Sequence, residues 1–125
     1  MKSTQDLLDE ANATVPRLST EEAIAIHAKD AGTFIDVRDS ADIAKSGTIA
    51  GAQRIPRGFL EFAADPDLGF HNPALDRQAD LYLVCGKGGQ AALAGKTLMD
   101  LGFTSVTNVG GVGSWKEAGG PMEDA

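Results

Sequence analysis

The stretch LYLVCGKGGQAALAGKTL, residues 81–98, places an apolar run, a glycine-rich loop and a helix-forming segment one after another. The run at residues 81–84 is typical of a strand that is covered on both faces, as in a parallel sheet. After the loop, Ala91, Ala94 and Leu98 recur at the spacing of one face of a helix. This succession predicts a buried strand that leads through a tight loop into an amphipathic helix.

Strands and helices alternate along the rest of the chain. Thr33–Val37 and Ser105–Val109 have the β-branched composition that is typical of strands. Ser19 and Glu22 have the spacing of a capping box, which predicts the start of a helix. Helices are expected at about residues 3–13, 19–29, 39–45, 57–64 and 114–118. This alternation predicts an α/β sandwich with a mainly parallel central sheet flanked by helices.

The composition excludes several classes of protein. A chain of 125 residues with 42% apolar residues suits one domain with a single core, and no apolar run approaches the roughly 20 residues of a membrane helix. Acidic residues near the N-terminus interrupt any secretory signal. Eighteen acidic against eleven basic side chains give a net charge of −7, which disfavours nucleic acids and anionic membranes as partners. We therefore expect a cytoplasmic domain that binds neither.

The chain has one cysteine, Cys85, and two histidines, His27 and His71, which lie far apart in the sequence. A single cysteine cannot form an internal disulfide or a multi-thiolate metal centre. We therefore expect neither a metal site nor a cofactor. Cys85 is then either a small core residue or a reactive thiol, and its surroundings decide between the two.

The surroundings of Cys85 favour a reactive thiol. Cys85 lies at the carboxyl end of the predicted strand, where ligands bind in α/β sheets. Three of the next five residues are glycines, which allow a tight turn with N–H groups directed inward as an anion-binding nest. The helix that starts near Gly89 or Gln90 adds its positive N-terminal end, and Lys87 adds a full charge. Each of these features favours the nucleophilic thiolate.

Three other loop motifs fit this stretch less well. Gly86 to Ala91 matches the dinucleotide pattern G-x-G-x-x-A, but residues 106–108 lack the acidic group expected there for the ribose. The Walker motif requires Ser or Thr after its lysine, whereas Gly88 follows Lys87. Cysteine-dependent phosphatases place an arginine six residues after the cysteine to clamp the oxyanion. That position is Ala91, and no arginine follows Cys85 anywhere, which disfavours phosphatase chemistry.

Taken in order, five segments of the chain resemble a rhodanese domain. They are FIDVR at 34–38, GTIAGA at 47–52, IPRGFLEF at 55–62, CGKGGQ at 85–90, and a closing segment with GG at 110–111 and WKEAGGP at 115–121. The resemblance implies a three-layer sandwich whose central parallel sheet has about five strands. It covers roughly residues 17–122, so we expect a domain at 17–125 preceded by a helical extension at 1–16.

The resemblance also implies an activity. Rhodanese-like enzymes move a sulfane sulfur from thiosulfate or a similar donor, through a cysteine persulfide, to cyanide, a thiol or a protein acceptor. It implies a six-residue active loop with glycine at its fourth position, and Lys87 at the third resembles members that use thiosulfate. The expected site has Cys85 as nucleophile and a substrate-binding loop of Gly86, Lys87, Gly88, Gly89 and Gln90. The alternative is a non-catalytic or partner-specific rhodanese-like module.

Two positions depart from the common pattern of the family. Gln90 stands where many single-domain members have an arginine, and Thr48 stands where a histidine is common. We further expect Asp36 and Arg38 to be structural, with Arg38 in an internal ion pair, and Trp115 to lie in the core. His27, on a helix with charged neighbours, is expected to be solvated. Arg57 is expected either at the pocket mouth or at an exposed helix start.

Overall fold

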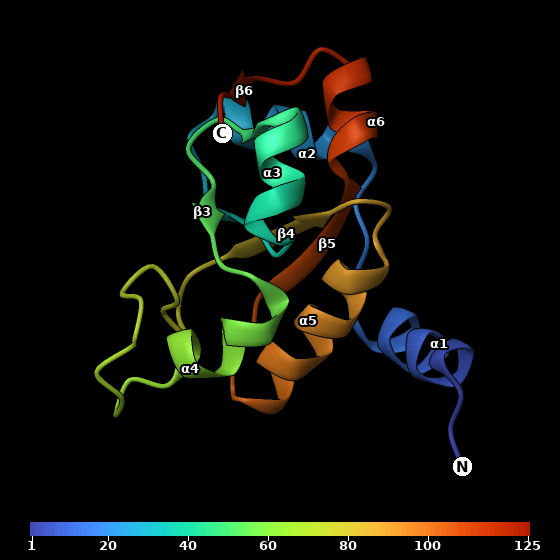
Figure 1. Cartoon of the computed structure of the whole chain (residues 1–125), viewed down its shortest axis with the longest axis vertical. Helices are drawn as coiled ribbons and strands as arrows, with labels where there is room; N and C mark the ends of the chain where they lie inside the picture. The colour runs from blue at the N-terminus through green and yellow to red at the C-terminus, as the bar shows by residue number, and fades with distance from the viewer.

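The computed structural model describes residues 1–125 and is built around a parallel sheet (Figure 1). The strands lie in the order β3 (Gln53–Arg54), β1 (Thr33–Asp36), β4 (Leu81–Cys85) and β5 (Val106–Gly111). Every neighbouring pair in this sheet is parallel. The predicted α/β sandwich is therefore confirmed. The sheet has four strands rather than the expected five, and Arg17 adds a single parallel bridge to Asn108 at the outer edge of β5.

Helices cover both faces of the sheet and complete the three layers (Figure 1). One set comprises α1 (Thr4–Thr14), α4 (Leu60–Ala64) and α5 (Gly89–Asp100), seen below the sheet in the figure. The other set comprises α2 (Thr20–Ala28), α3 (Ser40–Ser46) and α6 (Val112–Glu117), seen above it. None of these helices has the length and apolar character needed to cross a membrane.

The apolar run before the loop forms β4, and its side chains divide between two cores. Leu81, Leu83 and Cys85 belong to the larger core, which also contains residues of α4 and α5. Val84 belongs to the second core, together with residues of α2 and α6. Because both faces of β4 are covered, the strand shows a continuous apolar run rather than an alternating one.

The helix and strand boundaries agree with the sequence to within a few residues, with two exceptions. The helix expected at 57–64 is a 3₁₀ turn, η1 (Arg57–Phe59), followed by the short α4. The sequence also gave no sign of the small antiparallel sheet formed by β2 (Thr48–Ile49) and β6 (Met122–Glu123). Strands of two residues are too short to show a periodic pattern. The capping box of Ser19 and Glu22 is present at the start of α2, as predicted.

Arg38 forms the internal ion pair predicted for it, and its partner is Asp36 at the end of β1. Arg38 donates from Nη2 to Asp36 Oδ2 over 2.8 Å, and the Asp36 residue is fully buried. The Thr48 hydroxyl donates to the same carboxylate oxygen over 2.7 Å. Arg38 also donates to Ser46 Oγ and to the carbonyl of Gly47. The pair therefore ties the end of β1 to the segment that joins α3 to β2.

The expectation that His27 is solvated is wrong. Its ring is half-buried, edge-on to Phe34 and Trp115 at 5.2 and 5.3 Å between centroids. Its Nε2 lies 2.7 Å from the carbonyl oxygen of Ala50. The charged neighbours of His27 occupy other faces of α2, so they did not reveal that this position faces the sheet. Trp115 is buried, as predicted.

The C-terminal strand β6 is fastened by the exposed side chain of Glu123. This carboxylate accepts a hydrogen bond from the Gly51 N–H and pairs with Arg54 at 2.9 Å. The Gly51 N–H first, and Arg54 second, hold the pKa of Glu123 below its ordinary value. A lowered pKa means that the carboxylate stabilises the fold above the ordinary glutamate pKa of about 4.3, and that this contribution is lost as the pH falls through the folded-state value.

We therefore predict that Glu123→Gln lowers the unfolding temperature at pH 7, and that the difference from the parent protein shrinks in acid. Because the side chain is exposed and screened by solvent, the loss should be at most about 1 kcal/mol. Thermal unfolding followed by circular dichroism at pH 7 and pH 3 measures it. Glu117→Gln removes an exposed carboxylate that has no partner and should leave both temperatures unchanged. A larger loss in acid than at pH 7 would contradict the argument.

Candidate active site

Cys85 is the last residue of β4, and its sulfur is enclosed by the loop that follows. Sγ accepts hydrogen bonds from the backbone N–H of Gly88 at 2.9 Å and of Ala91 at 3.3 Å. The Cys85 residue is only 1% exposed. Because α5 begins at Gly89, these two donors are the N-cap residue of the helix and a residue of its first turn, so the sulfur lies at the positive end of the helix dipole. This arrangement stabilises a negative charge on Sγ.

Two glycines allow the loop to close so tightly. Gly88 has φ +101°, a left-handed conformation that other residues rarely adopt. Gly111 lies opposite Cys85 across the β4–β5 pairing, and a Cβ there would collide with the carbonyl oxygen of Gly86. The loop is therefore seated directly on the end of β5, and a larger residue at position 111 would push it away.

Asn108, on β5, holds the Cys85 loop in place through hydrogen bonds of its side chain. It was not among the predicted site residues. Its buried side chain donates from Nδ2 to the carbonyl of Gly88 over 2.9 Å and accepts from the Gly110 N–H over 2.8 Å. Asn108 thus holds the same residue whose N–H is bonded to the cysteine sulfur. The available signal was one amide in a short strand that ends in a Gly-Gly pair, and it was weak.

The remaining predicted residues lie in the same loop but do not contact the sulfur. Gly86, Lys87 and Gln90 are exposed. The side chains of Lys87 and Gln90 make no hydrogen bond or ion pair with the rest of the protein. Of the backbone N–H groups predicted to hold the sulfur, only that of Gly88 is bonded to Sγ. The Lys87 charge is therefore free to meet an anion that approaches the loop.

Arg17 brings a second positive charge to the loop from far away in the sequence. Its guanidinium lies against Gly88 and Gly110: a Cβ at either glycine would come within 2.8 Å of a guanidinium nitrogen. Two backbone hydrogen bonds with Asn108, from the residues on either side of Arg17, fix its position. Sequence reasoning missed this residue because nothing local links it to Cys85.

Arg57 does not belong to the Cys85 loop. Its guanidinium donates to Glu61 and to Thr97, each over 2.9 Å, so it joins η1 to α4 and α5. Of the two expected positions, the structure therefore supports the one at the start of a helix.

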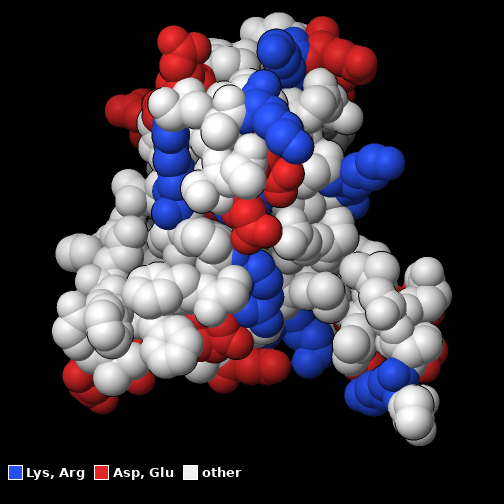
Figure 2. All heavy atoms as spheres, viewed as in Figure 1, with Lys and Arg blue, Asp and Glu red and all other residues white.

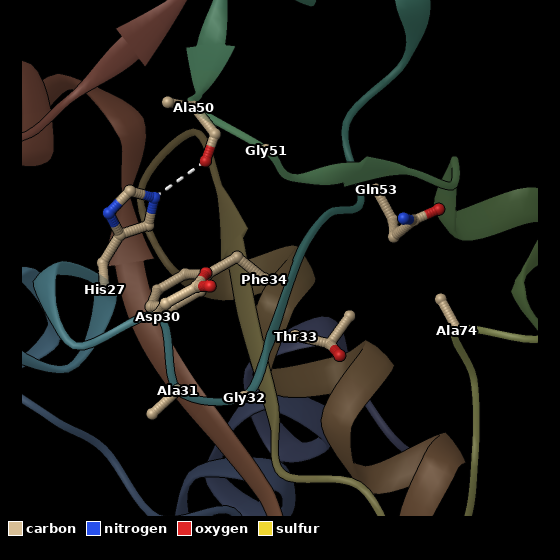
Figure 3. Close-up of a pocket in the computed structure, with 10 residues that line it drawn as sticks. All are labelled: His27, Asp30, Ala31, Gly32, Thr33, Phe34, Ala50, Gly51, Gln53 and Ala74. Atoms are coloured by element: carbon tan, nitrogen blue, oxygen red, sulfur yellow. Dashed lines mark hydrogen bonds between the residues drawn. The ribbon is translucent and has the colours of Figure 1, made fainter.

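The cavity drawn in Figure 3, of about 200 Å³, lies away from Cys85. It is lined by His27, Phe34, Gln53 and other residues around the start of β1, and the figure shows His27 pointing at the Ala50 carbonyl. Cys85 ends β4, which runs parallel to β1, so the cavity and the thiol lie toward opposite ends of these strands. The cavity is therefore separate from the loop.

The surface view shows how charge is distributed on one face (Figure 2). Positive and negative side chains are interspersed there, and the region over α4 and the following loop is mostly uncharged. Three exposed phenylalanines come from this part of the chain: Phe59 at the end of η1, Phe62 in α4 and Phe70 in the following loop. The Phe59 ring lies 5.8 Å, between centroids, from each of the other two. The face shows no continuous basic patch of the kind that binds nucleic acid.

Solved structures similar to this one come from different organisms. A protein of unknown function from Rhodopseudomonas palustris, named a possible tyrosine phosphatase, is 36% identical with a TM-score of 0.93, over 98% of this chain and 96% of that one. The human single-domain sulfurtransferase TSTD1 is 28% identical with a TM-score of 0.71, over 82% and 96%. A rhodanese-related protein from Thermoplasma volcanium is 26% identical with a TM-score of 0.70, over 86% and 97%.

The search of curated proteins gave no match. The model of the family called rhodanese-like domain matches residues 19–118, which include the strands of the main sheet, the Cys85 loop and α6. With this match over most of its length, and with the fold and loop described above, the chain belongs to the rhodanese-like domain family.

Proposed function

We propose that this protein is a sulfurtransferase that takes a sulfane sulfur from thiosulfate or a similar anionic donor and passes it on through a persulfide on Cys85. The observation that carries the proposal is the position of Sγ, which accepts hydrogen bonds from two backbone N–H groups at the start of α5. These donors are placed to hold a negative charge on the sulfur, and the thiolate is the nucleophile in sulfur transfer. The free charge of Lys87 beside the loop suits an anionic donor.

The proposed reaction has two steps and needs no further oxidant or reductant. The Cys85 thiolate attacks the outer sulfur of thiosulfate, so that a bond forms between Sγ and that sulfur while the sulfur–sulfur bond of thiosulfate breaks. Sulfite leaves with the bonding electron pair, and a persulfide anion remains on Cys85. Cyanide or a thiolate then attacks the terminal sulfur, giving thiocyanate or an acceptor persulfide and restoring the Cys85 thiolate.

The residues in and around the loop have separate roles in this scheme. Lys87 attracts the donor and offsets the charge of the departing sulfite. The N–H groups of Gly88 and Ala91 hold the negative sulfur, and Asn108 keeps Gly88 in place. Because Cys85 is only 1% exposed, small donors fit the site better than bulky ones. The proposed setting is the cytoplasm, where a reducing environment keeps a lone thiol free between turnovers.

Mass spectrometry of the intact protein tests the proposal. After incubation with thiosulfate and removal of excess reagent, the protein should gain the mass of one sulfur atom, and cyanide should remove it. Cys85→Ala should gain nothing under the same conditions. The proposal fails if the parent protein takes up no sulfur from thiosulfate or other sulfane donors, or if Cys85→Ala takes up the same amount.

A phosphatase assay should accompany this experiment, because one similar structure is named a possible tyrosine phosphatase. The position six residues after Cys85 is Ala91, a buried alanine that contributes its N–H but no positive charge. We therefore expect no Cys85-dependent hydrolysis of p-nitrophenyl phosphate. Hydrolysis that disappears in Cys85→Ala would instead support phosphoryl transfer.

A second candidate is a sulfur carrier that serves one protein partner. The exposed aromatic cluster of Phe59, Phe62 and Phe70 favours it, because apolar patches of this kind commonly contact other proteins. The two candidates differ in their preferred acceptor and donor. Faster transfer from or to a protein persulfide than from thiosulfate to cyanide would favour the carrier.

A further inference from the structure

We propose that Arg17 provides the Cys85 loop with a second, permanent positive charge and thereby makes the site selective for anionic sulfur donors. The inference rests on the proposed function and extends it to the choice of donor. Arg17 lies outside the loop and before α2, so it is not one of the residues that the loop motif itself would identify.

The backbone fixes where Arg17 lies. The carbonyl of Pro16 accepts from the Asn108 N–H over 2.9 Å, and the Leu18 N–H donates to the Asn108 carbonyl over 3.1 Å. Arg17 is thereby held in a parallel bridge beside Asn108. The side chain of the same Asn108 is bonded to the carbonyl of Gly88. One residue of β5 therefore positions both the arginine and the loop.

The guanidinium occupies space that two glycines leave open. A Cβ on Gly88 would lie 2.8 Å from Nη1 of Arg17, and a Cβ on Gly110 would lie 2.8 Å from Nη2. The N–H of Gly88 is itself the closer donor to the cysteine sulfur. The charge thus lies against Gly88, the residue whose N–H is bonded to the sulfur.

Arg17 differs from the other arginines in having no partner for its side chain. Arg38, Arg54 and Arg57 each pair with a carboxylate, and Arg77 donates to the carbonyl of Leu101. No hydrogen bond or ion pair engages the Arg17 guanidinium. Its donors are therefore available to an anion, and no neighbouring carboxylate neutralises its charge.

An arginine at this position attracts anionic donors through the electrostatic field of its positive charge. Opposite charges attract more strongly beside a protein than in bulk water, and salt weakens the attraction. Thiosulfate carries two negative charges, so it gains more from Arg17 than a neutral reagent does. Gln90, at the end of the loop, is neutral, which leaves Lys87 and Arg17 as the cations there.

Three variants test the inference. Arg17→Gln removes the charge, Arg17→Lys keeps it, and Arg77→Gln makes the same change in charge at an exposed arginine that packs beside Leu101. We expect Arg17→Gln to raise the KM for thiosulfate by about 3- to 30-fold with a smaller change in kcat, as the loss of one nearby charge would produce. Arg17→Lys should recover most of the loss, and Arg77→Gln should match the parent protein.

A measurement independent of turnover separates charge from structure. Iodoacetate is anionic and iodoacetamide is neutral, and both alkylate a cysteine thiolate. The ratio of their rates at Cys85 should fall in Arg17→Gln by a factor similar to the change in KM, and remain near the parent value in Arg17→Lys. Added salt should lower the ratio in the parent protein toward that of Arg17→Gln.

The possible outcomes distinguish this inference from the proposed function. An unchanged alkylation ratio in Arg17→Gln overturns the role of Arg17, even when the sulfur adduct on Cys85 forms normally. Equal losses in Arg17→Gln and Arg17→Lys also overturn it, because they indicate a structural role. If the parent protein forms no sulfur adduct at all, the proposed function fails, and the alkylation ratio still decides whether Arg17 attracts anions to Cys85.

Discussion

Replacing Cys85 with serine should lower the rate of sulfur transfer from thiosulfate to cyanide by at least about a thousandfold, comparable to the loss of the nucleophile in other enzymes. A serine hydroxyl is a far weaker nucleophile than a thiolate and cannot form a persulfide. Its oxygen can still accept hydrogen bonds from the N–H groups of Gly88 and Ala91, so the loop should keep its shape. The formation of thiocyanate, followed by colour with ferric ion, measures the rate.

The control for this experiment is Lys116→Gln, which alters an exposed residue of α6 that has no partner. It should transfer sulfur at the parental rate. The unfolding temperature of Cys85→Ser should stay close to that of the parent protein, because oxygen replaces sulfur in a site of nearly the same size. Residual activity above about one tenth of the parental rate, well beyond what an enzyme without its nucleophile retains, would show that another group carries the sulfur.

The second large effect is expected on stability, at the ion pair of Asp36 and Arg38. Asp36→Asn keeps the shape of the side chain but leaves the Arg38 guanidinium buried without a balancing charge. Breaking one side of a buried pair costs about 3–5 kcal/mol. The hydrogen bond from Thr48 also loses its charged acceptor. Urea unfolding at pH 7 should show this loss as a lower midpoint with an unchanged slope.

The double variant Asp36→Asn with Arg38→Met separates the loss of the pair from the presence of an unpaired charge. Removing both charges is often close to neutral, so the double variant should regain a substantial part of the stability. A single variant Asp36→Asn that unfolds within about 1 kcal/mol of the parent protein would show that the pair behaves like an exposed one.

The sequence was most informative where one segment carried a complete local pattern. The apolar run of β4 and the helix α5 follow each other directly, and both were predicted within a few residues. The capping box of Ser19 and Glu22 depends on groups three residues apart, so it too was visible. By contrast, β2 and β6 stabilise each other only after the chain has folded, since each contains two residues. His27 was misjudged for a similar reason, because its aromatic neighbours come from other elements.

The residues of the candidate site likewise fall into two groups: those that lie close together in the sequence and those that only the fold brings together. Cys85, Lys87 and Gly88 lie within four consecutive residues, so the loop could be identified as a unit from its sequence. Asn108 lies 20 residues beyond Gly88, and only the pairing of β4 with β5 brings its amide beneath the loop. Arg17 is more distant still in the sequence and reaches the loop through a bridge of a single residue pair. Contacts that depend on the order of strands leave no local pattern to detect.

The bridge of Arg17 to Asn108 has a consequence for the solubility of the protein. Exposed sheet edges offer unpaired N–H and C=O groups, and these invite strands of other copies to aggregate. At one margin of this sheet, β3 has only two residues. At the other margin, the segment of residues 16–18 already occupies backbone groups of β5, at Asn108. The segment that carries Arg17 to the loop therefore also covers the edge of the longest strand at Asn108, which hinders edge-to-edge association there.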